Sequence, residues 1–189
     1  LRSSSAASDV YKRQEKWSRV VEAASKVNSL PLYFDDAPVI TVTDIRAKSR
    51  RLKSSKGLDL IIVDYLQLMQ SSSGDNRQQE IAEISRNLKN LARELRVPIL
   101  ALSQLNRAAE AREDKRPRLG DLRESGAIEQ DADIVMMLYR DDYYNPGTEI
   151  PGVAEVNIVK NRSGQTGKVE LFFSKEFTQF SNYSKQEQQ

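Results

Sequence analysis

The sequence lacks cysteine and histidine altogether. These absences exclude disulfides, thiol nucleophiles, zinc sites built from Cys and His, and any catalytic triad that uses a histidine base. A long apolar run is missing too, because no stretch approaches the roughly 20 residues that a membrane-spanning helix needs. We therefore expect no membrane segment. Catalysis is limited to carboxylates, Lys, Arg, hydroxyls, backbone amides or a hard cation such as Mg²⁺.

An excess of either charge is also missing, since 29 basic and 27 acidic residues give a net charge of +2. Bulk charge therefore does not indicate nucleic-acid binding, and only local clusters can do so. The length of 189 residues and the hydrophobic content of 39% fit one globular domain with one core. We expect that domain to span residues 15–183. We expect residues 1–14 to be disordered or foreign to the domain, and residues 184–189 to be a disordered tail.

Apolar residues spaced by three and four predict helices in the first half of the chain. Asp75 and Gln78 offer a capping-box-like start for one of them, and Thr41 or Thr43 can cap another, which is strongly basic. The apolar spacing and composition predict helices at 15–29 and 76–95 and a short strand at 30–36.

Three nearly continuous apolar runs are typical of strands that are buried on both faces, and therefore of a parallel sheet. Two further β-rich runs flank the turn sequence SGQTG, which predicts an antiparallel hairpin. Because helices alternate with strands, the predicted fold class is α/β, with a mostly parallel sheet flanked by helices and a C-terminal β-hairpin. The runs are LDLIIVDYL at 58–66, VPILALSQL at 97–105, DADIVMMLY at 131–139, AEVNIVKNR at 154–162 and KVELFFS at 168–174.

Polar side chains follow two of the predicted parallel strands. Asp64 comes directly after LIIV, and Ser103 and Gln104 close the next strand. Ligands of open α/β sheets bind at the carboxyl ends of strands. An Asp at such an end can hold Mg²⁺ through water in a nucleotide hydrolase, which is the Walker B position, and a Gln can bond a terminal phosphate and relay its presence to a loop. Both positions are also compatible with ordinary polar strand ends.

The phosphate-cradling loop of such a site is absent from the sequence. That loop has the pattern G-x-x-x-x-G-K-[ST]. Only Gly167 is followed by a lysine, and there Val169 stands in place of Ser or Thr while Arg162 occupies the first glycine position. If Asp64 is a Walker B acid, we expect its P-loop partner to precede Leu1.

Two charged segments lie later in the chain. Residues 106–130 mix basic and acidic side chains, and they form either a self-paired solvated loop or a loop that contacts phosphates through its cations and the backbone at Gly126. Lys160 and Arg162 are two residues apart on a predicted strand, so they share one face. They either protect an exposed edge strand or form a cationic finger that reaches a phosphate on a neighbouring subunit.

Four segments resemble, in order and spacing, the C-terminal motor domain of the DnaB family of replicative DNA helicases. The resemblance covers about residues 15–183, and it implies a RecA-like α/β ATPase that uses ATP and Mg²⁺. It also implies a homo-hexameric ring on single-stranded DNA. The segments are LIIVDYLQLM, DNRQQEIAEISRNLKNLARELRVPILALSQLNR, KRPRLGDLRESGAIEQDADIVMMLYRDD and IVKNRSGQTGKVELFF.

The resemblance implies roles for individual residues. Asp64 matches the Walker B acid, and Gln104 matches the residue that couples the γ-phosphate to movement of the DNA loop. Arg162 matches the arginine finger, and Lys160 the cation beside it. The residues of DLRESG that match the DNA-contacting loop are Arg123, Glu124 and Gly126.

The implied function of the full-length protein is to translocate on single-stranded DNA and unwind the duplex at the replication fork. The implied location is the cytoplasm, and the implied partners are a helicase loader and primase. The family's P-loop and catalytic glutamate precede the part of the chain seen here. ATP hydrolysis is therefore expected of the full-length protein and not of these 189 residues alone.

Two other classes of protein stay open from the residues alone. A phosphoacceptor receiver domain needs an acid pair, a strand-end Asp, a strand-end Ser and a later Lys. The short spacing between the acid pair and Asp64, the long charged loop and the terminal hairpin speak against it. A non-catalytic RecA-like DNA-binding paralogue is the second class, and an intact upstream P-loop would exclude it. The residues that a receiver domain would use are Asp35, Asp36, Asp64, Ser103 and Lys160.

Overall fold

The computed structural model describes residues 17–70, 76–122 and 126–183, so both predicted tails lie outside the described residues. The chain divides into two units, residues 1–38 and residues 39–189. In the first unit, residues 17–28 form the predicted helix. The strand predicted at 30–36 does not form, and those residues are exposed. A strand needs a hydrogen-bonded neighbour, and no described strand pairs with this segment.

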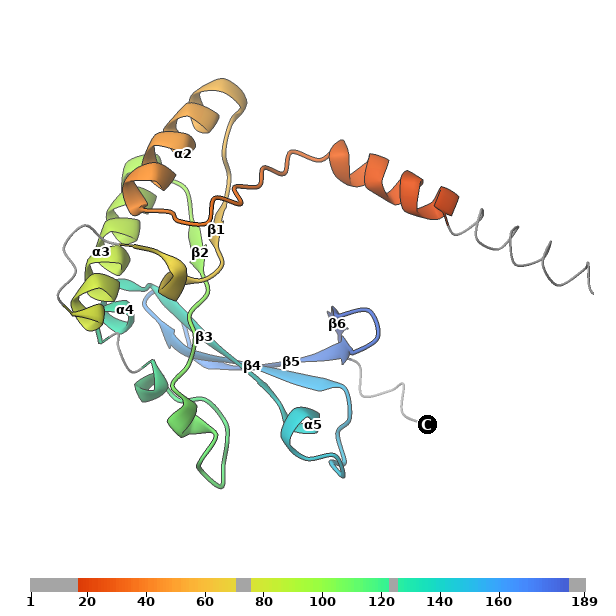
Figure 1. Cartoon of the computed structure of the whole chain (residues 1–189). Coiled ribbons are helices and arrows are strands. Elements are labelled where there is room, and N and C mark those ends of the chain that lie inside the picture. Colours follow the sequence, from red (N-terminus) through yellow and green to blue (C-terminus); the bar gives the residue numbers. More distant parts are fainter. Residues whose placement is uncertain (1–16, 71–75, 123–125, 184–189) are drawn as a thin grey trace, which may run out of the picture. The chain divides into compact units, whose positions relative to one another are not determined.

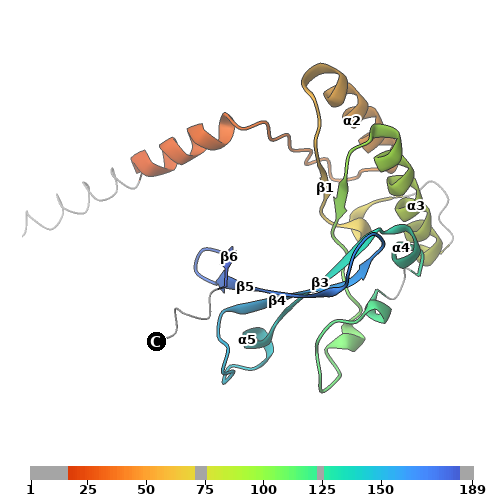
Figure 2. The ribbon, with the colours of Figure 1, turned by 180° about the vertical axis from the view of Figure 1, so that it is seen from behind.

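The second unit begins with two helices and a parallel pair of strands (Figure 1). Strands β1 and β2 pair in parallel, with Ile61 opposite Ile99 and Val63 opposite Ala101, which confirms the predicted pairing. Helices α2 and α3 lie side by side in both views (Figures 1 and 2) and are tied by an Arg50–Glu94 ion pair of 2.6 Å. The elements are α2 (Val42–Lys56), β1 (Ile61–Val63), the 3₁₀ helix η1 (Leu66–Leu68), α3 (Arg77–Leu95) and β2 (Ile99–Ala101).

Local sequence explains where these helices begin and end. The Thr41 hydroxyl accepts a bond from the Asp44 amide, and the Asp44 carboxylate accepts one from the Thr41 amide, which forms a complete capping box. The cap of α3 is Asn76, whose side chain accepts from the Gln78 amide at 2.9 Å. Asp75, the predicted cap, lies outside the described residues. Helix α3 ends with Arg96 in the left-handed conformation.

The main core forms between α3, the parallel strands and α2. The apolar face of α3 that the spacing predicts is buried against these elements. This burial is the main favourable contribution to the stability of this half of the unit. The buried residues are Val42, Ile45, Val63, Leu66, Met69, Ile81, Ile84, Leu88, Leu91, Leu95 and Val97.

The C-terminal half is a four-stranded antiparallel sheet in the order β3-β4-β5-β6. The predicted hairpin is confirmed as β4 and β5. The run at 131–139, predicted as a parallel strand, instead supplies β3, which pairs antiparallel with β4. The elements are η2 (Arg107–Ala109), η3 (Leu119–Asp121), α4 (Gly126–Asp131), β3 (Ile134–Arg140), α5 (Asp141–Tyr144), β4 (Val153–Asn161), β5 (Gly167–Ser174) and β6 (Gln179–Asn182).

The prediction that the apolar strands are buried on both faces is wrong for the described structure. One face of these strands is open, because Ile62 of β1 is 60% exposed and Met136 of β3 is 52% exposed. Burial in β3 alternates strictly, which is typical of a sheet covered on one side only. Among the described helices, none is long and apolar enough to cross a membrane.

Candidate functional site

The carboxyl end of the parallel pair gathers the predicted nucleotide-site residues. Asp64 follows β1 directly and is exposed, and the peptide bond to Tyr65 is cis. Gln104 follows β2, and its amide donates to the Gln67 Oε1 atom at 3.1 Å. Gln67 also donates from Nε2 to the Ser103 hydroxyl at 3.0 Å. The parallel register thus brings Asp64 and Gln104 to the same sheet end, and Gln67, which sequence reasoning missed, joins the two strand ends.

The residues at this end suit a magnesium–nucleotide complex better than a metal bound by protein alone. Within the described residues, no group of three or more carboxylates could hold a metal ion. Mg²⁺ in nucleotide sites binds one or two carboxylates and takes its other ligands from water and phosphates. An exposed Asp64 carboxylate at a strand end fits that requirement.

Lys160 and Arg162 lie at the far end of β4 and contact one neighbour, the end of α4. The Lys160 ammonium donates to the Glu129 carbonyl, and to the Gln130 carbonyl at 3.4 Å. The Arg162 guanidinium reaches the Gln130 carbonyl at 3.5 Å. The two side chains therefore do share one side of the strand, as their spacing predicts.

The strand geometry around these cations is irregular. Val135 pairs with Lys160 and Met136 with Ile158, so Val159 is an extra residue on β4, a β-bulge. The following turn is tight, because a Cβ atom on Gly164 would lie 2.7 Å from the Asn161 Nδ2 atom. Bulge and turn together fix the direction in which the two cations leave the strand.

The three predicted DNA-contacting residues are only partly described. Arg123 and Glu124 lie outside the described residues. Gly126 is the first residue of α4, and a Cβ atom there would meet nothing within 4 Å. The glycine is thus not required by packing inside the described chain.

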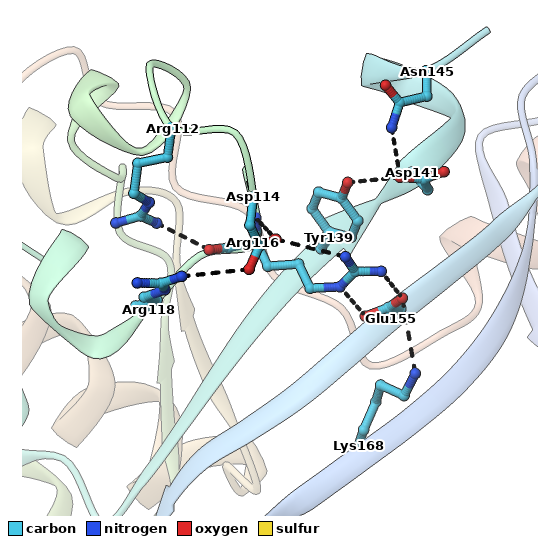
Figure 3. Close-up of polar contacts among 9 residues, drawn as sticks. All are labelled: Arg112, Asp114, Arg116, Arg118, Tyr139, Asp141, Asn145, Glu155 and Lys168. Carbon is cyan, nitrogen blue, oxygen red and sulfur yellow. Dashed lines mark hydrogen bonds and ion pairs between the residues drawn. The ribbon is translucent and has the colours of Figure 1, made fainter. Parts of the chain in front are cut away.

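Several cations of the charged loop are used in internal ion pairs, as the self-paired interpretation predicts. Arg112 binds the Asp121 carboxylate at 2.7 and 2.8 Å. Arg118 approaches Asp114 at 3.4 Å. Figure 3 shows these pairs beside Arg116, which points away from the loop toward β4. These three arginines organise the loop stem, so they are poor candidates for DNA contacts.

Arg116 makes the most buried ion pair of the described chain with Glu155 of β4. Its Nε and NH2 atoms donate to the two carboxylate oxygens at 3.0 and 2.8 Å. The guanidinium also lies over the Tyr139 ring, 4.6 Å from its centroid. Lys168 of β5 approaches the same carboxylate from the other side at 3.8 Å (Figure 3). Sequence reasoning did not single out Glu155, although an acid inside an apolar strand is unusual.

The pKa values of this cluster follow from its contacts. The hydrogen bonds from Arg116 hold the pKa of the Glu155 carboxyl below its ordinary value, although burial acts in the opposite direction. Burial and the hydrogen bond to Asp141 raise the pKa of Tyr139 to about 12. Both groups therefore keep one protonation state near neutral pH, and the cluster is structural.

Solved structures share this arrangement of strands and helices. One solved helicase ATPase domain superposes with a TM-score of 0.86 at 43% sequence identity, over 90% of this chain and 61% of that one. A DnaB-like replicative helicase, studied with its interactions with primase, gives a TM-score of 0.85 at 43% identity, over 90% of this chain and 42% of that one. The fold and the strand-end site thus define a helicase ATPase domain of the RecA-like class.

The chain belongs to the DnaB-like helicase C terminal domain family, which matches residues 3–182. The replicative DNA helicase DnaB of Geobacillus stearothermophilus is 55% identical over 170 residues, which are 89% of this chain and 37% of that protein. The replicative DNA helicase DnaC of Bacillus subtilis (strain 168) is 54% identical over 171 residues, 89% of this chain and 38% of that protein. The chain therefore spans little more than a third of these relatives. Family membership excludes the receiver-domain alternative.

Proposed function

We propose that this chain is part of an ATP-dependent replicative DNA helicase that translocates on single-stranded DNA and unwinds the duplex at the replication fork. The main support is the meeting of Asp64 and Gln104 at one end of a parallel strand pair, in a chain of this family. Ligands of α/β sheets bind at that end. The ATPase activity belongs to the full-length protein, because these 189 residues contain no P-loop.

In this proposal each site residue has a distinct role. Asp64 holds the water shell of Mg²⁺ bound to ATP, and Gln104 bonds the terminal phosphate and passes its presence to the DNA loop through the strand end. Lys160 and Arg162 reach the phosphates of a neighbouring subunit. Arg123, Glu124 and Gly126 form the DNA-contacting loop.

The proposed assembly is a homo-hexameric ring around single-stranded DNA in the cytoplasm. Primase and a helicase loader are its proposed partners. The primase proposal is supported by a structural relative with 43% identity, which was studied with its interactions with primase. A closed ring also suits the cations, since a finger that acts on a neighbouring site needs a repeated head-to-tail interface.

The experiment that tests this function compares the full-length protein with its Asp64→Asn variant. We expect DNA-stimulated phosphate release and ATP-dependent unwinding of a forked duplex in the wild type, and neither in the variant. DNA binding without hydrolysis by the wild type would instead support a non-catalytic paralogue.

A first prediction concerns the 189-residue chain by itself. We expect it to bind ATP weakly and not to hydrolyse it, because the backbone amides and Lys of the P-loop supply much of the phosphate affinity in such sites. Nucleotide titration and phosphate release measure the two properties. Robust DNA-stimulated turnover by this chain alone would contradict the prediction.

A second prediction concerns the DNA-contacting loop. In the full-length protein, Arg123→Ala should weaken single-stranded DNA binding without a base preference, because phosphate contacts position a strand and do not read it. The salt dependence of the affinity should fall, by about 0.7 in the log–log slope for one lost contact on a single strand. Arg118→Ala is the matched control, since Arg118 pairs with Asp114. An unchanged affinity and slope for Arg123→Ala would remove this residue from the interface.

A further inference from the structure

Asp133 lies where three elements of the second unit meet. It follows α4 and precedes β3 in the chain. One oxygen of its carboxylate binds the Lys89 ammonium from α3, and the other lies 3.5 Å from the Arg162 guanidinium at the end of β4. A single carboxylate thus connects the main helix of the core to the proposed finger.

The backbone strengthens the same connection. The Arg162 amide donates to the Asp133 carbonyl at 2.8 Å, which fixes the Cα atom of Arg162 beside Asp133. Two residues earlier on β4, the Lys160 ammonium donates to the Glu129 and Gln130 carbonyls. Those carbonyls belong to the last turn of α4, where the helix end carries partial negative charge. Both proposed phosphate-binding cations are therefore placed by the end of α4 and the residue after it.

The Arg162 side chain is held loosely enough to act on something else. Asp133 and Arg162 side chains are 55% and 53% exposed, and their nearest charged atoms are 3.5 Å apart. Such exposed pairs contribute little stability, so the guanidinium can leave the carboxylate for a stronger anion. Lys89 is far less exposed and holds the other carboxylate oxygen in place. The contact orients Arg162 without locking it.

The opposite end of α4 is the DNA side of the proposed site. Helix α4 begins at Gly126, directly after Arg123 and Glu124 in the sequence. With about 1.5 Å of rise per residue, six residues span about 9 Å, so a shift at the first turn moves the last turn as one body.

We propose that Asp133 is the positioning residue for Arg162, and that α4 couples the DNA-contacting loop to the Lys160–Arg162 pair. The proposal rests on the function proposed above. When DNA displaces the start of α4, its end carries the Glu129 and Gln130 carbonyls and Asp133 with it, and the two cations turn toward the neighbouring nucleotide. DNA stimulation of hydrolysis in this enzyme depends on that connection.

The test is Asp133→Asn in the full-length protein, with Asp131→Asn as the matched control. Asp131 is the last residue of α4 and loses the same charge, and the described structure gives it no ion pair with Lys89 or Arg162. We expect Asp133→Asn to lower the DNA-stimulated kcat about 3- to 10-fold, with the KM for ATP and the DNA affinity within about twofold of wild type. Asp131→Asn should behave as wild type. Asp133→Glu, which keeps the carboxylate, should recover part of the loss.

Two comparisons separate this inference from the proposed function. Combining Asp133→Asn with Arg162→Ala should lower kcat no further than Arg162→Ala alone, because one residue acts through the other. Ring assembly and the thermal midpoint of Asp133→Asn should match wild type. A wild-type kcat in Asp133→Asn, while Arg162→Ala is inactive, overturns the positioning role and leaves the proposed function intact. Absence of ATP hydrolysis in the wild-type protein overturns the proposed function itself.

Discussion

Replacing Arg162 with alanine in the full-length protein is expected to reduce ATP hydrolysis by a factor on the order of 10³–10⁵, the range found for arginine fingers. The guanidinium stabilises negative charge that develops on the transferred phosphoryl group, and a neutral methyl side chain supplies no such stabilisation. Arg162 leaves β4 just before a tight turn, and it is half exposed and paired with an equally exposed Asp133. Phosphate release in the presence of single-stranded DNA measures the effect.

The trans action of Arg162 has its own measurement in mixed rings. Subunits with Arg162→Ala and subunits with Asp64→Asn should each form nearly inactive rings. Mixing them creates some interfaces with an intact Asp64 on one side and an intact Arg162 on the other, so part of the hydrolysis should return. Mass measurement of the rings confirms mixed assembly. No recovery in mixed rings counts against action in trans.

Arg162→Lys is the control for charge alone. Lysine carries the same charge but lacks the planar fork of the guanidinium, so it should not restore hydrolysis. Full activity of the Arg162→Ala ring would end the finger hypothesis outright.

Arg116→Ala is expected to destabilise the 189-residue chain by about 3 kcal/mol at neutral pH. The reason is the partner that it leaves behind, since the Glu155 side chain is only 4% exposed and would keep an uncompensated charge. Lys168, at 3.8 Å, compensates it only in part. Urea unfolding followed by circular dichroism measures the loss. Arg118→Ala is the matched control and should cost less than about 1 kcal/mol, because its partner Asp114 is exposed.

The same pair predicts the sign of a pH effect. The pKa of Glu155 is lowered in the folded chain, so its contribution to stability is present above the ordinary carboxyl pKa of about 4.5 and is lost as pH falls through the folded-state value. In Arg116→Ala that contribution is gone at every pH. The difference in unfolding free energy between wild type and Arg116→Ala should therefore be largest near neutral pH and shrink below about pH 4.5. A difference that stays constant from pH 7 to pH 3.5 would assign the destabilisation to lost packing.

Local patterns predicted the elements that local interactions determine. The spacing of apolar residues predicted α3, because its buried face repeats every three or four residues. Thr41 was predicted as a cap because its partner Asp44 lies only three residues away. The strand-end positions of Asp64 and Gln104 follow from the runs that precede them and from the parallel pairing.

Features that depend on distant partners were not predictable in the same way. The Arg116–Glu155 pair joins residues 39 apart in sequence, and Gln67 reaches Gln104 across 37 residues. An apolar run states that a strand can be buried, but it does not state which strand pairs with it or in which direction, and β3 therefore appeared parallel. The run at 30–36 has the composition of a strand but pairs with no described neighbour.

The open apolar face of β1 and β3 has a thermodynamic consequence. Covering a side chain such as Ile62 or Met136 contributes on the order of 1.5–3 kcal/mol. Whatever polypeptide covers that face gains this free energy only when these strands are already formed, so the folding of the two is linked by mass action. In isolation, the 189-residue chain therefore has a stability that depends on its own concentration, because a second copy is an alternative cover. Within a ring of long chains, the same face makes the folding of this half and the capacity to bind nucleotide a single cooperative event.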